Sequence, residues 1–327
     1  MRISASKIKT YEGCSWKYYC NYHLRLPEKT HPKTNLGSVV HLVLEILADP
    51  KHRAKAEKIL ETQKLKSVPS VCRLTFKHLK KLEIPKNIAK DAGKLIMMGI
   101  NYDFFFKGHK KMLGPEYKFK IKIGKKHSAI GFLDGCADYG KTMVIRDYKT
   151  QKNRFTPEEL DFNIQAKTYQ LAMYKKHKKL ARVEFLLLRH DDFLQACEPA
   201  SKEELLGFEC YLESMATFLE DFTSQKAHGQ MASSQKMPKR GEGFKGPIMC
   251  GLRAKYPGQL KDNGEPMFHC AFKFSFEYFV LTNKKGDIIL TSKNEEELEK
   301  IKKRGQIVEK KHYYGCPSFP QKYVTAI

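Results

Sequence analysis

Long apolar runs are absent from this chain of 327 residues. A membrane-spanning helix needs about 20 consecutive apolar residues, and the apolar segment at 39–47 is too short for that role. The N-terminus carries basic residues with no apolar stretch behind them, so the pattern of a secretory signal is missing. The sequence therefore predicts a soluble protein of the cytoplasm, or of the host cytoplasm if the source is a virus, without a membrane partner.

Acidic residues are few compared with basic ones. The chain has 36 Asp and Glu against 60 Lys and Arg, which gives a formal net charge of +24. Such a charge attracts polyanions over long distances in a salt-dependent way. It favours a nucleic-acid partner and does not bear on catalysis. With 41% hydrophobic residues, the chain can form one large domain or one domain with an appendage.

A disulfide framework is not expected either. The chain has nine cysteines, but without a secretory pattern they are not predicted to pair. Five are scattered singly and are predicted to be packing residues: Cys20, Cys72, Cys136, Cys197 and Cys210. The other four cysteines are distributed differently: one lies near the start of the chain and three lie in its C-terminal part. They are Cys14, Cys250, Cys270 and Cys316.

The most informative pattern is Asp147-Tyr148-Lys149, at the end of the apolar segment 143–149. This segment is rich in β-branched residues, which predicts a buried strand. Side chains two apart on a strand share a face, so Asp147 and Lys149 should project into one site. A carboxylate can hold a divalent cation and a lysine can orient or deprotonate water, as metal-assisted phosphodiester cleavage requires. The alternative is an ordinary ion pair at a strand edge.

Apolar periodicity predicts further elements around this strand. They are a helix at 37–45, strands at 118–123 and 128–134, and a helix at 162–174. The first helix carries His41, and Glu116 and Asp134 lie beside the two strands. Gln165 and Tyr169 are four residues apart, so they share one face of the last helix.

This order resembles the RecB-like branch of the PD-(D/E)XK nuclease superfamily, which includes AddB-type and CRISPR-associated exonucleases. The matching motifs are G-x-x-x-H-x-x-L-E at 37–45, G-x-x-D at 131–134, D-Y-K-T at 147–150 and Q-x-x-x-Y at 165–169. The resemblance covers roughly residues 1–190, and Ser15 stands where many relatives have proline. It implies an α/β, restriction-endonuclease-like core: a small mixed sheet flanked by helices, with a helical insertion and a C-terminal extension.

The resemblance also implies a metal site. His41, Asp134, Asp147 and the carbonyl of Tyr148 would bind Mg²⁺ or Mn²⁺. Two carboxylates and a carbonyl suit these hard ions better than zinc. The alternative for His41 is a histidine that simply packs inside an apolar helix.

Catalytic roles follow from the same resemblance. Lys149 would position the nucleophilic water, and Gln165 and Tyr169 would hold the site and the DNA strand. Glu116 would be a supporting carboxylate or would bind a second metal. The alternative for Gln165 and Tyr169 is ordinary helix packing.

In AddB-type and CRISPR-associated relatives, one early and three late cysteines hold an iron–sulfur cluster that clamps the two ends of the domain. The four cysteines Cys14, Cys250, Cys270 and Cys316 have this layout, but the last three are widely spaced. His269 and His312 add ligands that zinc accepts. A 4Fe-4S cluster, a structural zinc ion and no metal therefore all remain open.

A competing pattern overlaps these residues. Residues 135–142 fit the phosphate-binding loop G-x-x-x-x-G-K-[ST] of ATPases. Such a loop must lead into a helix, whereas 143–145 is a strand-forming run. The two glycines, Gly135 and Gly140, are therefore predicted to form a hairpin turn that brings Asp134 close to Asp147.

The predicted organisation is a nuclease domain at 1–222 with a helical insertion at 49–112, a linker or mobile loop at 223–246, and a C-terminal cap at 247–327. In the cap, a hairpin around 283–286 is followed by a helix that begins with a capping box at Ser292 and Glu295 and ends near Gly305.

The function implied by the resemblance is divalent-metal-dependent hydrolysis of DNA, with an exonuclease that acts from DNA ends favoured. Alternatives are a single-strand or structure-specific endonuclease and a non-catalytic DNA-binding module. The intact Asp134, Asp147 and Lys149 argue against the last of these. No helicase motif is present, so in DNA repair or recombination a helicase or recombination protein would have to unwind duplex DNA.

Overall fold

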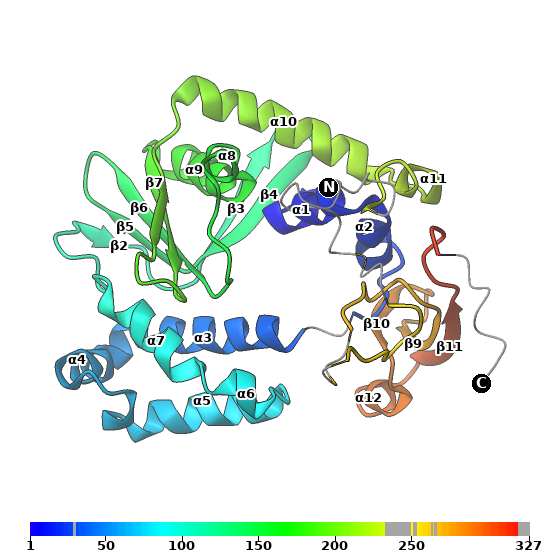
Figure 1. Ribbon diagram of the computed structural model, residues 1–327. Helices are drawn as coiled ribbons and strands as arrows, with labels where there is room; N and C mark the ends of the chain where they lie inside the picture. The colour runs from blue at the N-terminus through cyan, green and yellow to red at the C-terminus, as the bar shows by residue number, and fades with distance from the viewer. Residues whose placement is uncertain (29–30, 233–249, 251–253, 263, 265–266, 320–327) are drawn as a thin grey trace. The chain divides into compact units, whose positions relative to one another are not determined.

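The computed structural model describes residues 1–28, 31–232, 250, 254–262, 264 and 267–319 (Figure 1). It forms two compact units, the first made of 1–5 and 30–218 and the second of 6–29 and 219–327. The sequence analysis placed 6–29 in the N-terminal domain, whereas its contacts group it with the C-terminal region. Within the described residues, no helix has the length and apolar character that crossing a membrane would need.

The first unit combines strands and helices, as predicted. Its strands are β1 Arg2–Ile3, β2 Lys111–Met112, β3 Tyr117–Ile123, β4 His127–Leu133, β5 Gly135–Asp138, β6 Met143–Lys149, β7 Ala181–Leu187 and β8 Leu194–Cys197. Its helices are α3 Pro32–Ala48, η1 Pro50–His52, α4 Arg53–Thr62, η2 Leu65–Ser67, α5 Pro69–Lys81, α6 Lys86–Ala89, α7 Ala92–Asn101, α8 Pro157–Asp161, α9 Ile164–His177 and α10 Lys202–Glu220, whose last two residues belong to the second unit.

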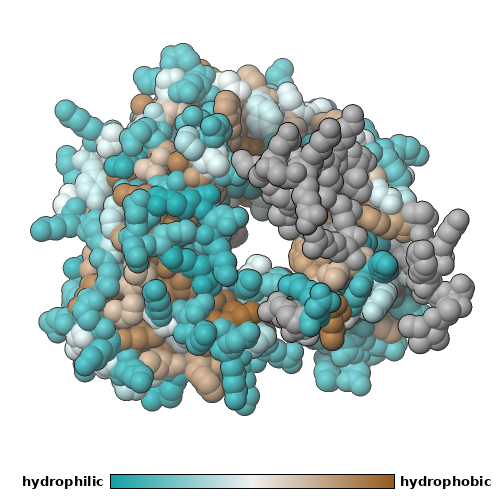
Figure 2. Space-filling view, viewed as in Figure 1, coloured by the Kyte–Doolittle hydropathy of each residue, from teal (hydrophilic) through white to brown (hydrophobic). Residues whose placement is uncertain are grey.

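Two mixed sheets form the centre of this unit. Their strand orders are β1-β4-β3 and β2-β5-β6-β7-β8, and β6 and β7 run parallel. Helix α9 contacts β7 of one sheet and β3 and β4 of the other, so it lies between them. Helices α3 to α7 lie together on the other side of the strands (Figure 1). Hydrophilic residues cover most of the drawn face of this unit (Figure 2).

Strand β6 is central because β5 and β7 pair with its two edges. A strand covered on both faces should read as a continuous apolar run, and residues 143–149 have this character apart from their charged residues. Arg146 and Asp147 are both buried here, with 3% and 4% of their surface exposed. Buried charges must be paired, so both side chains need partners within the fold.

The P-loop-like segment is a hairpin. Strand β5 is followed by a tight turn and then by β6, with no helix where phosphates would bind. Gly140 has φ +96°, a left-handed conformation that favours glycine, and its N–H donates to Asp138 Oδ1 at 2.8 Å. The hairpin prediction is confirmed, but Gly135 lies inside β5 rather than in the turn.

Helix α3 extends the predicted helix in both directions. His31 caps it by accepting a hydrogen bond from Lys33 N, and Pro32 occupies its first turn. One face packs against the helices of the insertion and against Tyr148, Leu186 and Leu188. The other face therefore remains available for polar residues.

The second unit contains α1 Ala5–Gly13, of which Ala5 belongs to the first unit, α2 Ser15–Tyr22, α11 Ser224–Ala227, β9 Phe276–Thr282, β10 Ile288–Ser292, α12 Glu295–Glu299 and β11 Ile307–Tyr313. Its sheet has the antiparallel order β10-β9-β11. The predicted hairpin is confirmed, and β11 was not predicted. Of the predicted linker, 233–246 lies outside the described residues, and 224–227 is helical.

The predicted helix cap in this unit is wrong. Asn294, not Ser292, caps α12, and its side chain accepts from Glu296 N at 3.0 Å. Ser292 is still part of β10, so its backbone cannot occupy the cap position, and its hydroxyl donates to Glu297 instead. The helix ends at Glu299, well before Gly305.

Candidate active site

Asp147 and Lys149 lie on one face of β6, as their spacing predicts. Lys149 Nζ is 2.5 Å from Asp147 Oδ2. The Asp147 side chain is 5% exposed and that of Lys149 is 20% exposed, so the pair is reached from solvent on the lysine side. Phe185 from β7 lies beneath the ammonium, with 5.4 Å between Nζ and the ring centre. This environment strengthens the attraction between the two charges because it excludes water.

Gln165 and Tyr169 complete a closed network around this pair. Gln165 Nε2 donates to Asp147 Oδ1 at 2.7 Å and to the Tyr169 hydroxyl at 2.6 Å. Tyr169 donates to Asp147 Oδ1 at 3.1 Å, and Lys149 Nζ donates to Gln165 Oε1 at 2.9 Å. Gln165 and Tyr169 therefore share one face of α9, as their spacing predicts, and both contact Asp147.

Helix α9 presents these two side chains because its start is fixed. The side chain of Asn163 caps the helix by accepting from Ala166 N at 3.0 Å. Burial foremost, and then the charge of Asp147, raise the pKa of Tyr169 well above its ordinary value. The phenol consequently keeps its proton and acts as a donor to the carboxylate.

His41 and Asp134 form a second pair beside the network. His41 Nδ1 lies 3.2 Å from Asp134 Oδ1 and 3.1 Å from Oδ2, and Oδ2 accepts from Tyr148 N at 2.9 Å. Asp134 stands at the junction of β4 and β5, so this hydrogen bond ties it to β6. Burial alone would lower the pKa of His41, but the hydrogen bond to Asp134 and the charges of Asp134 and Asp147 raise it. Asp134 thus contacts the residue next to Asp147.

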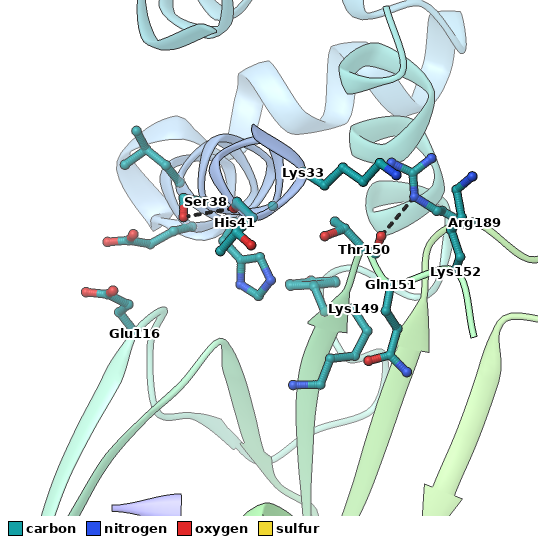
Figure 3. Close-up of a pocket in the computed structure, with 14 residues that line it drawn as sticks. Lys33, Ser38, His41, Glu116, Lys149, Thr150, Gln151, Lys152 and Arg189 are labelled. Atoms are coloured by element: carbon teal, nitrogen blue, oxygen red, sulfur yellow. Dashed lines mark hydrogen bonds between the residues drawn. The ribbon is translucent and has the colours of Figure 1, made fainter. Parts of the chain in front are cut away.

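His41 from the pair and Lys149 from the network line an open cavity of about 710 Å³ (Figure 3). Glu116 reaches it from the loop before β3, and His41 and Lys149 point into the same space. Glu45, one turn after His41 on α3, also lines it. Burial, Glu116 and Asp134 raise the pKa of Glu45. The sequence analysis included Glu45 in a motif but not among the site residues, although its i+4 spacing from His41 indicated a shared face.

The donor set fits a hard divalent cation in kind, because it offers two carboxylates and a carbonyl. The separation of 3.1–3.2 Å between His41 Nδ1 and the Asp134 oxygens is a hydrogen-bonding distance. Asp147 Oδ2 is buried and makes no hydrogen bond of normal geometry. Among the described residues, however, no set of three or more His, Cys, Asp or Glu side chains is already spaced as a metal site.

Gly131 of the G-x-x-D pattern supports this site through packing. It is the cross-strand partner of Phe119, and a Cβ on Gly131 would lie 2.5 Å from Phe119 Cζ. The Phe119 ring is fully buried and meets Tyr169 edge to face at 6.0 Å. The glycine therefore leaves room for the ring that supports Tyr169.

Gly131→Ala is expected to lower the free energy of unfolding by about 1–3 kcal/mol, because overpacking forces the buried ring to move. Gly207→Ala in α10 is the matched control, since nothing lies within 4 Å of its Cβ position. This control should stabilise by up to about 1 kcal/mol. Urea denaturation measures the free energy of unfolding of both variants. We expect it to fall in Gly131→Ala and to rise in Gly207→Ala, and equal changes in the two would contradict the packing role of Gly131.

The four predicted cluster cysteines belong to the second unit. Cys14 precedes α2, and Cys270 N donates to the carbonyl of Cys250 at 3.3 Å. Burial, and then Cys14, Cys270 and Cys316, raise the pKa of Cys250 to about 12. Burial foremost, with Cys14 and Cys270, raises that of Cys316 to about 11. Neighbouring cysteines thus contribute to the raised pKa values of Cys250 and Cys316, although the described atoms are not at ligand spacing.

Comparison with known proteins places this chain in a family. Residues 2–238 match the sequence profile of the PD-(D/E)XK nuclease superfamily, whose members generally use divalent metals such as Mg²⁺ or Mn²⁺. A solved candidate exonuclease from Eubacterium rectale is 12% identical, with a TM-score of 0.42, and the match covers 73% of this chain and 91% of that chain. Curated protein sequences give no match.

Proposed function

Since the chain belongs to the PD-(D/E)XK nuclease superfamily, we propose that it is a divalent-metal-dependent deoxyribonuclease that acts from DNA ends. The observation that carries the proposal is the closed network of Asp147, Lys149, Gln165 and Tyr169 beside the pair of His41 and Asp134. One member of each group, Lys149 and His41, lines the same open cavity in a strongly basic chain. This combination offers a cation site, a positioned ammonium and room for a phosphate group.

His41, Asp134, Asp147 and the Tyr148 carbonyl would hold Mg²⁺ or Mn²⁺, and Glu116 and Glu45 add negative charge nearby. When bound, the cation supplies positive charge to the scissile phosphate and lowers the pKa of water. Lys149 orients the attacking water and offsets the charge that develops on the phosphate. Gln165 and Tyr169 fix Asp147 Oδ1, so Oδ2, which the Lys149 ammonium contacts in this structure, is the oxygen that would turn to the cation.

Three DNA substrates test the proposal: end-labelled linear single strands, end-labelled duplexes and closed single-stranded circles, each with and without Mg²⁺. We expect linear DNA to be shortened from its ends, circles to stay intact, and EDTA to stop the reaction until Mn²⁺ or Mg²⁺ is restored. Cleavage of circles would replace the exonuclease by an endonuclease. Binding without cleavage of any substrate would indicate a non-catalytic module. Slow action on blunt duplexes would fit a requirement for a partner helicase.

We further propose that Cys14, Cys250, Cys270 and Cys316 hold a 4Fe-4S cluster. Support comes from their grouping in one unit and from the contribution of the other three to the raised pKa of Cys250. Thiols with raised pKa values stay protonated at neutral pH, so metal binding would have to release protons. Ligation would join the segment before α2 to the region that follows β11.

Anaerobically purified protein is expected to show broad visible absorption and to contain iron and sulfide. Cys270→Ser should remove the colour and lower the melting temperature, because the link between distant segments is lost. Cys210→Ser, an exposed cysteine of the first unit, is the control and should change neither property. Zinc without iron would indicate a structural zinc site instead. Neither metal in the parent protein would refute the cluster.

A further inference from the structure

The cavity has a basic side opposite its carboxylates. Lys33 on α3, Lys152 after β6 and Arg189 after β7 all line it. None of the three belongs to the motifs described above, and they are far apart in the sequence. Figure 3 shows the Lys33 side chain pointing toward Arg189, with Lys152 close by. The fold therefore brings three cationic side chains to one wall of the proposed active site.

Arg189 is held firmly in this wall. Its Nε donates to the carbonyl of Thr150 at 2.8 Å, and its Nη1 donates to Asp91 Oδ2 at 2.8 Å. The side chain is only 19% exposed. Thr150 directly follows Lys149, so the guanidinium is anchored to the residue next to the proposed water-positioning lysine. An arginine fixed at two of its nitrogens still has N–H groups for a ligand.

Positive charge exceeds negative charge on this side of the cavity. Asp91, 37% exposed, pairs with Arg189. The ammonium groups of Lys33 and Lys152 make no hydrogen bond or ion pair with any described residue, and both residues are exposed. Cations gathered in one place repel one another, and an anion with several acceptor oxygens would relieve that repulsion. A phosphate group has this chemistry and is already implied by the proposed function.

We infer that Lys33, Lys152 and Arg189 form a second phosphate subsite, which holds the phosphate next to the scissile one on the same DNA strand. The inference rests on the proposed function for its ligand. Arg189 would bind through its remaining N–H groups, and the two lysines would act as point charges. Anchoring of Arg189 to Thr150 sets the position of this phosphate relative to Lys149. The subsite thus orients the strand as well as binding it.

Salt-dependent binding of a fluorescent single-stranded oligonucleotide in EDTA tests the subsite without requiring cleavage. Each lost phosphate contact should reduce the slope of log K against log salt by about 0.7 for single strands. Lys33→Gln and Lys152→Gln should each show this decrease, and the double variant should show both. Lys126→Gln is the matched control, because Lys126 is an exposed lysine of the same unit in the turn between β3 and β4 and does not line the cavity. It should leave the slope unchanged.

Arg189→Lys tests whether the phosphate is bound by the shape of the guanidinium or by its charge alone. Lysine keeps the positive charge but lacks the planar set of N–H donors. We expect it to raise KM for linear DNA by about tenfold, the effect of roughly one lost good contact, with a smaller effect on kcat. Oligonucleotides with a 5′-phosphate, a 3′-phosphate or no terminal phosphate identify the bound group. If Arg189→Lys weakens the binding of all three oligonucleotides equally, the subsite holds an internal phosphodiester, as inferred. Weakening confined to one phosphorylated end places a terminal phosphate there and overturns the assignment to the internal neighbour.

An unchanged slope in the double variant, or an equal change in Lys126→Gln, would refute the subsite. If the parent protein cleaves DNA and the slopes do not change, the subsite fails and the nuclease proposal stands. If the slopes fall as expected but no metal supports cleavage, the three residues still bind a DNA phosphate and the nuclease proposal fails. The two ideas can therefore be rejected separately.

Discussion

Asp147→Asn is expected to reduce DNA cleavage by about 1,000-fold or more, as for loss of a group that acts on the reacting centre. The asparagine keeps the size of the side chain and can still accept from Tyr169, but it lacks the negative charge that a cation requires. Lys149→Ala should have an effect of similar size. Its ammonium lies 2.5 Å from the Asp147 carboxylate, and no other described ammonium is placed there to take over its role. DNA affinity in EDTA should stay close to that of the parent, since nearly all of the +24 charge remains.

Asp138→Asn is the control for this experiment. Asp138 lies on the neighbouring strand β5 and also pairs with a lysine, Lys179, at 2.6 Å. It does not line the cavity, so its variant should cleave DNA at close to the parent rate. Single-turnover cleavage of end-labelled DNA in Mg²⁺ measures all these variants. An Asp147→Asn rate within tenfold of the parent would rule out the assigned site.

The largest effect on stability is expected from Glu184→Leu. Arg146, 3% exposed, donates to Glu184 Oε2 at 2.9 Å and to Asp103 Oδ2 at 3.0 Å. Its guanidinium also stacks on Phe106, 3.9 Å from the ring centre. Removing one partner of a buried ion pair leaves an uncompensated charge and costs about 3–5 kcal/mol. The remaining contact with Asp103 should keep the loss near the lower end of that range.

Glu57→Leu provides the comparison. Glu57 pairs with Arg53 on α4 at 2.8 Å, but the two side chains are 50% and 58% exposed. Exposed helix pairs contribute only about 0.3–0.5 kcal/mol. Urea denaturation followed by far-UV circular dichroism should therefore separate the two variants clearly. Similar losses in both would mean that the Arg146 network does not stabilise the first unit.

The parts of the site that depend on local periodicity could be predicted from the sequence. Strand β6 was predicted with its observed bounds, because its apolar run and its two-residue spacing are local properties. The shared face of Gln165 and Tyr169 followed from helical geometry in the same way. The fold class was also predicted, since a mixed α/β architecture follows from the order of such elements.

Features that depend on contacts between distant segments could not be predicted. Arg146 is a single charged residue in a strand, and only the fold brings it to Asp103 and Glu184. Strand β11 has an exposed, lysine-rich pattern, and its pairing with β9 is what makes it a strand. The wall formed by Lys33, Lys152 and Arg189 is another example, because isolated basic residues carry no pattern in so basic a chain.

The short contact between Lys149 Nζ and Asp147 Oδ2 has a consequence for how the site is loaded. The ammonium acts as a counterion to this carboxylate, so under the proposed function a divalent cation would have to compete with it for Oδ2. Binding of the cation would then be an ion exchange that frees the Lys149 amine to contact water and the phosphate. We expect Lys149→Met to bind Mn²⁺ more tightly than the parent in a calorimetric titration while being inactive. Weaker binding would show that the lysine helps to build the cation site rather than competing for it.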